Sequence, residues 1–290
     1  MNAILACATL LGSAGVSCAH PILGNPPTAM HPRPGAGATA STTPYASSVI
    51  SYDAGSNAAP GYTDPLAALG APTRDTSPTS EFGGAVTPFQ SAFGPDELVS
   101  IGEGGHLTIA FDHAVTNDPN NPFGIDLLIF GNASYTDVAY PDGLAGGLLA
   151  EGGTIAVSAD GIHFVDVPGL DADGAFPTLG YLDPTGAATE FGQPPITGTI
   201  ESDFTKPVDP ALDMTGLTLA EIIAAYDGSG GGVGIDVGAL GLDSITHVRI
   251  DNPLGSGFTP EIDAFADVAV PAPSAVGLLL LGAAARRRRA

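Results

Sequence analysis

The chain contains no tryptophan, two cysteines and eight basic residues among 290 positions. Both cysteines, Cys7 and Cys18, lie in an N-terminal segment that has the pattern of a removable signal peptide. A mature protein without that segment has no cysteine at all. This absence excludes a disulfide scaffold, thiolate catalysis and cysteine-ligated zinc.

Positive charge is also scarce: outside the C-terminus, Arg33, Arg74, Lys206 and Arg249 face 31 acidic residues. Nucleic acid is excluded as a partner, because binding phosphates needs a basic surface. The acidic residues are 23 Asp and 8 Glu. Asp is typical of turns and of oxygen-ligand cation sites, so the bias predicts a loop-rich β protein that binds Ca²⁺. A merely soluble, acidic surface is the alternative.

The N-terminal segment predicts export. Ile4 to Val16 is an apolar run, and Ser17-Cys18-Ala19 offers small residues for cleavage before His20. Its start carries no Lys or Arg, so a buried N-terminal strand and a lipoprotein signal acylated at Cys18 are alternatives. Residues 20–43 are mainly Pro, Gly, Ala and Thr, which predicts a flexible leader.

The C-terminal tail has a short Pro-x-Pro motif, an apolar stretch and an arginine cluster. The stretch Ser274 to Ala285 corresponds to about 18 Å of helix, short for a bilayer core of about 30 Å. This tail resembles that of bacterial exported proteins with a PEP-CTERM-type sorting signal. The resemblance implies recognition by a membrane-embedded sorting protease and delivery to the cell surface or an extracellular polysaccharide matrix. The sorting residues it implies are Pro271, Pro273, Arg286, Arg287, Arg288 and Arg289.

Short apolar runs separated by turn residues predict an all-β protein. Residues 125–130 are apolar almost throughout, which predicts a central strand covered on both faces. Asp160-Gly161, between Val157 and Phe164, predicts a two-residue hairpin turn. The expected strands cover residues 49–52, 107–111, 125–130, 155–157, 164–167, 245–250 and 262–270.

One short surface helix is expected after Thr218, because Thr218 and Glu221 form a capping box. The helix should end at Asp227-Gly228. Residues 231–236 are interpreted as a flexible linker, and Asp171-Ala172-Asp173-Gly174 as an acidic turn.

The middle of the chain carries a second set of motifs. They are Gly61-Tyr62-Thr63-Asp64-Pro65, Ala68-Leu69-Gly70, Leu98 to Gly102, Gly105 to Phe111, Gly124 to Asn132, Ser158 to Gly161 and Val248-Arg249-Ile250. These sequences resemble bacterial cell-surface relatives of discoidin-like, galactose-binding-type jelly rolls. The resemblance implies one jelly-roll β-sandwich over residues 44–270, with long loops, used mostly for binding. Family members commonly have Trp where this chain has Phe164, and stacking on sugars normally needs such aromatic rings.

Carboxylates at the ends of expected strands are the candidate metal ligands. The first and last strands of a jelly roll commonly lie close together, so Asp64, Glu261 and Asp263 are expected to converge on Ca²⁺. Otherwise Asp64 caps a turn and the other two are solvated. Asp126 leads into an apolar strand, so its carboxylate must pair with another group, bind a cation or lie at a solvent-exposed end of the strand. Asn132, after the same strand, is a further candidate ligand. The alternative is that Asp126 and Asn132 merely flank turns.

Catalytic signatures are missing from the sequence. The chain has no Gly-x-Ser-x-Gly elbow and no phosphate loop, and His106, His113, His163 and His247 are isolated. We therefore expect an exported, non-enzymatic binding protein of the cell surface or matrix, associated with calcium and glycans. The alternatives are a secreted carbohydrate-active hydrolase or lyase with acidic catalytic residues, and a structural surface-layer component.

Overall fold

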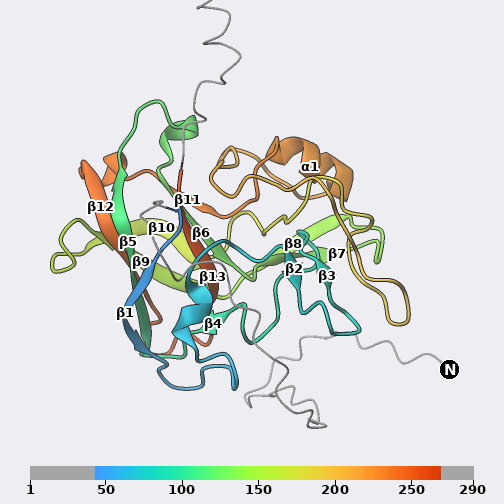
Figure 1. Cartoon of the computed structure of the whole chain (residues 1–290), viewed down its shortest axis with the longest axis horizontal. Coiled ribbons are helices and arrows are strands. Elements are labelled where there is room, and N and C mark those ends of the chain that lie inside the picture. Colours follow the sequence, from blue (N-terminus) through green and yellow to red (C-terminus); the bar gives the residue numbers. More distant parts are fainter. Residues whose placement is uncertain (1–42, 269–290) are drawn as a thin grey trace, which may run out of the picture. The chain divides into compact units, whose positions relative to one another are not determined.

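Two antiparallel sheets form the framework of the computed structural model, which describes residues 43–268 (Figure 1). The larger sheet has the strand order β1-β5-β12-β9-β10, and the second has the order β11-β6-β13-β4. The larger sheet consists of β1 (Ser48–Asp53), β5 (His106–Thr116), β12 (Ser244–Asp251), β9 (Gly152–Ser158) and β10 (Val165–Asp173). The second consists of β11 (Val233–Ile235), β6 (Leu127–Gly131), β13 (Glu261–Asp267) and β4 (Val99–Ser100).

Two further sheets, called ribbons below, have two strands each. One pairs β2 (Asp75–Thr76) with β3 (Gly84–Ala85), and the other pairs β7 (Ser134–Asp137) with β8 (Ala145–Leu149). Within residues 43–268, helical structure is limited to α1 (Leu219–Tyr226) and the 3-10 turns η1 (Pro65–Ala68), η2 (Pro122–Gly124) and η3 (Gly238–Leu240). The all-β prediction is therefore confirmed for the described residues, while the jelly-roll topology stays a prediction.

Alternating apolar side chains build the core between the two sheets. Leu107, Ile109 and Phe111 of β5 point into one buried cluster together with Leu127 and Ile129 of β6. The opposite face of β6 presents Leu128 and Phe130 to a second cluster, which Phe204 completes. Strand β6 is thus central and buried on both faces, as its continuous apolar run predicts.

The long segment 174–232, between β10 and β11, covers the side of β6 that faces away from the larger sheet. Its Phe204 packs edge-on against Phe130, with ring centroids 5.4 Å apart. Other residues of the segment form a separate core with Tyr135 of β7, including Val208, Met214 and Ile222. The boundary between the strands and segment 174–232 is called the seam below.

Helix α1 begins and ends as its sequence predicts. The Thr218 side chain accepts a hydrogen bond from the Glu221 backbone N–H, and the Glu221 carboxylate accepts one from the Thr218 backbone. Asp227 ends the helix in a left-handed conformation with φ of 49°. Ile222 and Tyr226 are buried, so one face of the helix packs onto the segment's core.

Three local predictions were wrong. Val157 pairs with Val165, so the connection between β9 and β10 is longer than the two-residue turn expected at Asp160-Gly161. Asp171 to Asp173 belong to β10 rather than to an acidic turn, because β9 supplies their pairing partners. The expected linker 231–236 contains β11, which pairs with β6.

Three other predictions fall outside the described residues: the signal peptide at 1–19, nearly all of the leader at 20–43, and the sorting tail at 271–290. The contacts of the chain divide it after residue 40, and every described residue belongs to the second unit. Among the residues from 43 to 268, no helix is both long and apolar enough to cross a membrane.

Candidate functional site

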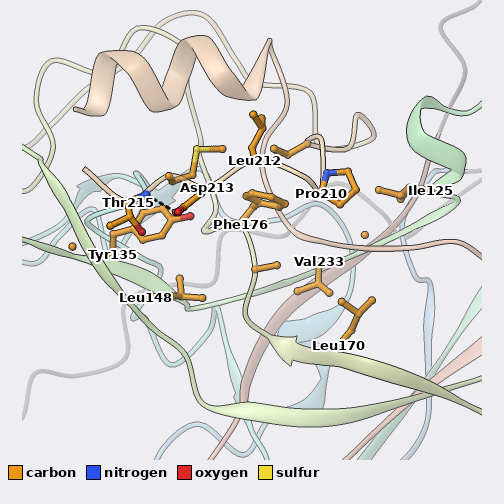
Figure 2. A pocket seen from close by; sticks show the side chains of 15 residues that line it. Ile125, Tyr135, Leu148, Leu170, Phe176, Pro210, Leu212, Asp213, Thr215 and Val233 are labelled. Carbon is orange, nitrogen blue, oxygen red and sulfur yellow. Dashed lines mark hydrogen bonds between the residues drawn. The ribbon is translucent and has the colours of Figure 1, made fainter. Parts of the chain in front are cut away.

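An apolar cleft of about 340 Å³ opens along the seam between the strands and segment 174–232 (Figure 2). Tyr135 and Leu148 are directly opposite each other on β7 and β8, so their side chains lie on the same face of that ribbon and both line the cleft. Residues from β10, β11 and the segment complete the walls. These include Leu170, Phe176, Pro210, Leu212 and Val233.

The rim of the cleft exposes large apolar side chains. Leu148 and Leu212 are each 40% exposed, and Leu170 is 36% exposed. A ligand that covers them removes apolar surface from water, which is favourable by about 25 cal/mol per Å². The cleft is therefore shaped and lined for the apolar part of a small ligand.

One end of the cleft is polar, where Tyr135, Asp213 and Thr215 gather (Figure 2). Hydrogen bonds from the backbone and side chain of Thr215 hold the pKa of Asp213 below its usual value, and the backbone bond is 2.9 Å long. Burial, helped by the charge of Asp213, raises the pKa of Tyr135 to about 12. At neutral pH this end thus presents a carboxylate and a neutral phenol.

The Tyr135 hydroxyl has no hydrogen-bond partner within residues 43–268, but it is open to solvent, since the one buried side-chain oxygen or nitrogen without a partner in that range is Asn121 Oδ1. A phenol hydroxyl that faces a cleft can donate a hydrogen bond to, or accept one from, water or a ligand. The hydroxyl is therefore available to a molecule in the cleft.

A second cleft, of about 480 Å³, gathers the carboxyl groups of Glu151, Asp173 and Glu261 beside Asn132 and Phe258. Burial raises the pKa of Asp173 to about 7, against hydrogen bonds from the backbone N–H groups of Glu151 and Ala133. Burial, followed by the charges of Glu151 and Asp173, also raises the pKa of Glu261 to about 7. Carboxyl groups of this kind exchange protons near neutral pH, as catalytic acids and bases do.

The structure does not bring Asp64, Glu261 and Asp263 together. Asp64 caps η1 by accepting a bond of 3.0 Å from the Leu66 N–H. Asp263 is buried and accepts bonds from the backbone N–H and the hydroxyl of Thr73, at 2.7 and 3.1 Å. The register of β13 is irregular between Ile262 and Ala264, so Glu261 and Asp263 do not follow regular alternation onto one face.

Asp126 and Asn132 lie beyond opposite ends of β6, about 20 Å apart at the usual rise of a strand. The Asp126 carboxylate is fully buried and accepts bonds from Asp118 N–H, Asn121 Nδ2 and Val237 N–H. Asn132 instead donates a hydrogen bond to Glu261 in the second cleft. These two residues therefore do not share a metal site.

The described part of the chain contains no preformed metal site. No group of three or more His, Cys, Asp or Glu side chains there is placed to hold an ion. Of the five candidate ligands, only Asn132 and Glu261 meet, and Asp173 and Glu151 join them. Calcium binding stays a prediction.

Sequence reasoning missed the residues of the apolar cleft. Tyr135, Phe176 and Asp213 are distant in the chain, and no motif links them; the turn-forming pair Asp209-Pro210 is the one local signal that could have indicated the 208–215 loop. No protein-family model matches the chain, and no curated protein matches it. Its function must therefore be argued from these two clefts.

Proposed function

We propose that this chain is an exported, non-enzymatic binding protein of the cell surface or extracellular matrix, and that its ligand occupies the apolar cleft. The observation that carries this proposal is the apolar concavity itself, with the unpartnered Tyr135 hydroxyl at its polar end. Concave, mostly apolar sites with a few polar groups are the usual form of small-ligand sites. The missing catalytic motifs favour binding over catalysis.

The cleft can be tested with a small neutral probe. Titrating benzyl alcohol into the protein while following backbone NMR signals should shift residues around Phe176 and Val233 first. Leu212→Ala removes part of the apolar rim and should weaken binding about fivefold. Leu254→Ala, at a side chain that is 80% exposed and does not line the cleft, is the matched control. Shifts spread evenly over the surface would contradict a site in the cleft.

Export is supported by the two terminal segments. On this proposal the signal peptide is removed before His20, a membrane sorting protease recognises the C-terminal tail, and surface polysaccharide is a further partner. Mass spectrometry of the protein recovered from its host should find neither the first 19 residues nor the Arg286 to Arg289 cluster. An intact arginine cluster on the exported protein would remove the sorting part of the proposal.

Calcium enters the proposal as a stabilising ion. An ion at 100 times its dissociation constant stabilises a protein by about 2.7 kcal/mol, so chelation should lower the melting temperature. Identical melting curves with calcium and with chelator would show that calcium does not stabilise the protein.

A carbohydrate-active enzyme is the second candidate, favoured by the carboxyl groups of Asp173 and Glu261 in the second cleft. Glycoside hydrolysis needs one protonated and one ionised carboxyl, and pKa values of about 7 place both groups in the right range. Release of sugars from acidic and neutral polysaccharides, lost in Glu261→Gln but kept in Glu81→Gln at an exposed site, would establish this activity. No release by the unaltered protein would leave binding as its role.

A further inference from the structure

We infer that the apolar cleft selects a small organic cation with an apolar body, such as an alkylammonium or arylammonium ion. This inference rests on the proposed binding function of the cleft and specifies its ligand class. Three features support it: the walls, the polar end and the charge of the surroundings.

The walls fit a body without many polar groups. Leu148, Leu170 and Leu212 form the exposed rim, and Val233 and Phe176 lie between them (Figure 2). A sugar ring carries a hydroxyl on nearly every carbon, and each needs a partner once it is buried. The described lining offers such partners mainly at the Tyr135 end. A hydrocarbon chain or an aromatic ring therefore matches the walls better than a sugar does.

The polar end fits a positive charge. Asp213 provides a carboxylate, and the aromatic ring of Tyr135 beside it attracts cations through its electron-rich face. The unpartnered Tyr135 hydroxyl can accept a hydrogen bond from an ammonium group. One ammonium ion at this end would thus satisfy both side chains.

The surroundings disfavour an anion. No Lys, Arg or His is among the described residues that line the cleft, so nothing there would neutralise an incoming carboxylate or phosphate. The chain has a formal net charge of −23, and such a field concentrates cations and repels anions. A metal ion is also unsuited, because the apolar walls cannot replace its hydration shell.

The inference can be tested with three probes that share one carbon skeleton: benzylamine, benzyl alcohol and benzoate. Calorimetric titration of the full chain at neutral pH should give benzylamine an affinity about fivefold or more above that of benzyl alcohol. Benzoate should bind more weakly than the alcohol. Raising the salt concentration should reduce the preference for the amine, because salt screens the exposed carboxylate.

Two matched variants assign the preference to one side chain. Asp213→Asn keeps an oxygen for the Thr215 N–H but removes the charge, so it should bind the amine and the alcohol about equally. Asp209→Asn changes a carboxylate in the same loop, which accepts a 2.9 Å bond from the Ala211 N–H and does not line the cleft. This control should keep the full preference.

The outcomes separate the inference from the proposed function. Equal affinity of the unaltered protein for amine and alcohol would overturn the cation preference and leave the binding function standing. Binding of none of the three probes would contradict the cleft as a binding site. Equal loss of preference in both variants would show that the general field of the protein, rather than Asp213, attracts the cation, and would also overturn the inference.

Discussion

At the scale of single residues, aspartates hold the loops of this protein in place. Asp126, Asp173 and Asp263 are fully buried, and each accepts hydrogen bonds from backbone N–H groups. Exposed aspartates do the same over short distances, because the side chain reaches the N–H two residues on. The excess of Asp over Glu therefore reflects loop architecture to a large extent. Such short-range bonds are made by Asp53, Asp64, Asp118, Asp137, Asp160, Asp203, Asp209 and Asp213.

Asp126 gives the sharpest stability prediction. Asp126→Ala leaves the Asp118 N–H, the Asn121 amide and the Val237 N–H without their acceptor, and each such donor costs about 1–3 kcal/mol. Urea unfolding should show a loss of at least about 3 kcal/mol. Asp118→Ala is the control, since its exposed carboxylate serves only Asn120, and it should cost less than about 1 kcal/mol. Equal losses would refute the anchoring role.

Glu261 gives a prediction on pH. Its pKa is raised from 4.5 to about 7, so the folded state keeps a proton that the unfolded state has lost. Stability should therefore fall as pH rises from about 4.5 to 7, by up to about 1.4 kcal/mol for each unit of raised pKa. Asp173 acts in the same direction, since its pKa is raised from 3.8 to about 7.

Melting temperatures between pH 5 and pH 8 test this sign. The unaltered protein should melt lower at pH 8, and Glu261→Gln should show a smaller decrease, because Gln does not ionise and can still accept the Asn132 bond. Glu81→Gln, at an exposed position, should behave like the unaltered protein. A melting temperature that rises over this range would mean that groups with lowered pKa dominate.

At the scale of elements, local and tertiary signals agree for α1 and for β6. The capping box of α1 joins residues only three apart, so its hydrogen bonds are encoded locally. Strand β6 is specified by a continuous apolar run, which fits a position between β11 and β13 with cover on both faces. Neither element lines the apolar cleft, but β11, the partner of β6, contributes Val233 to it.

The cap of α1 is testable by one substitution. Thr218→Ala removes the acceptor of the Glu221 N–H and should destabilise the protein by about 1 kcal/mol in thermal or urea unfolding. Thr218→Ser keeps the hydroxyl and should retain most of that stability. An equal loss in both variants would point to the Thr218 methyl group rather than to the cap.

At the scale of the whole molecule, the dominant feature is unbalanced negative charge. The chain carries 31 acidic against 8 basic residues, and half of the basic ones belong to the terminal arginine cluster. Mutual repulsion destabilises a compact state, although it favours solubility. Removal of the tail would make the imbalance larger.

Salt should therefore stabilise the protein. Raising NaCl from about 20 mM to about 500 mM shortens the screening length well below 10 Å, so the melting temperature should rise. CaCl₂ at matched ionic strength is the comparison: an extra gain would indicate specific calcium binding. An unchanged melting temperature in NaCl would mean that the acidic residues are too well separated to repel.

The sequence alone determined the features that depend on neighbouring residues. The alternation in Leu107, Ile109 and Phe111 and the apolar run before Asn132 predicted strands correctly, and the Thr218 capping box predicted helix α1. These signals work because strand alternation and helix capping act within a few residues. The signals at the two termini lie outside the described residues and stay predictions.

The tertiary structure decided whatever depends on partners far along the chain. The sequence of Asp171 to Asp173 predicts a turn, but these residues form a strand because they pair with β9. The sequence of Val233 to Ile235 predicts a linker, but these residues form a strand because they pair with β6. Asp263 meets Thr73 across 190 positions, rather than Asp64. Tyr135 and Asp213 share a cleft only because segment 174–232 packs against the strands. No local pattern encodes such meetings, since they follow from which surfaces the folded chain buries together.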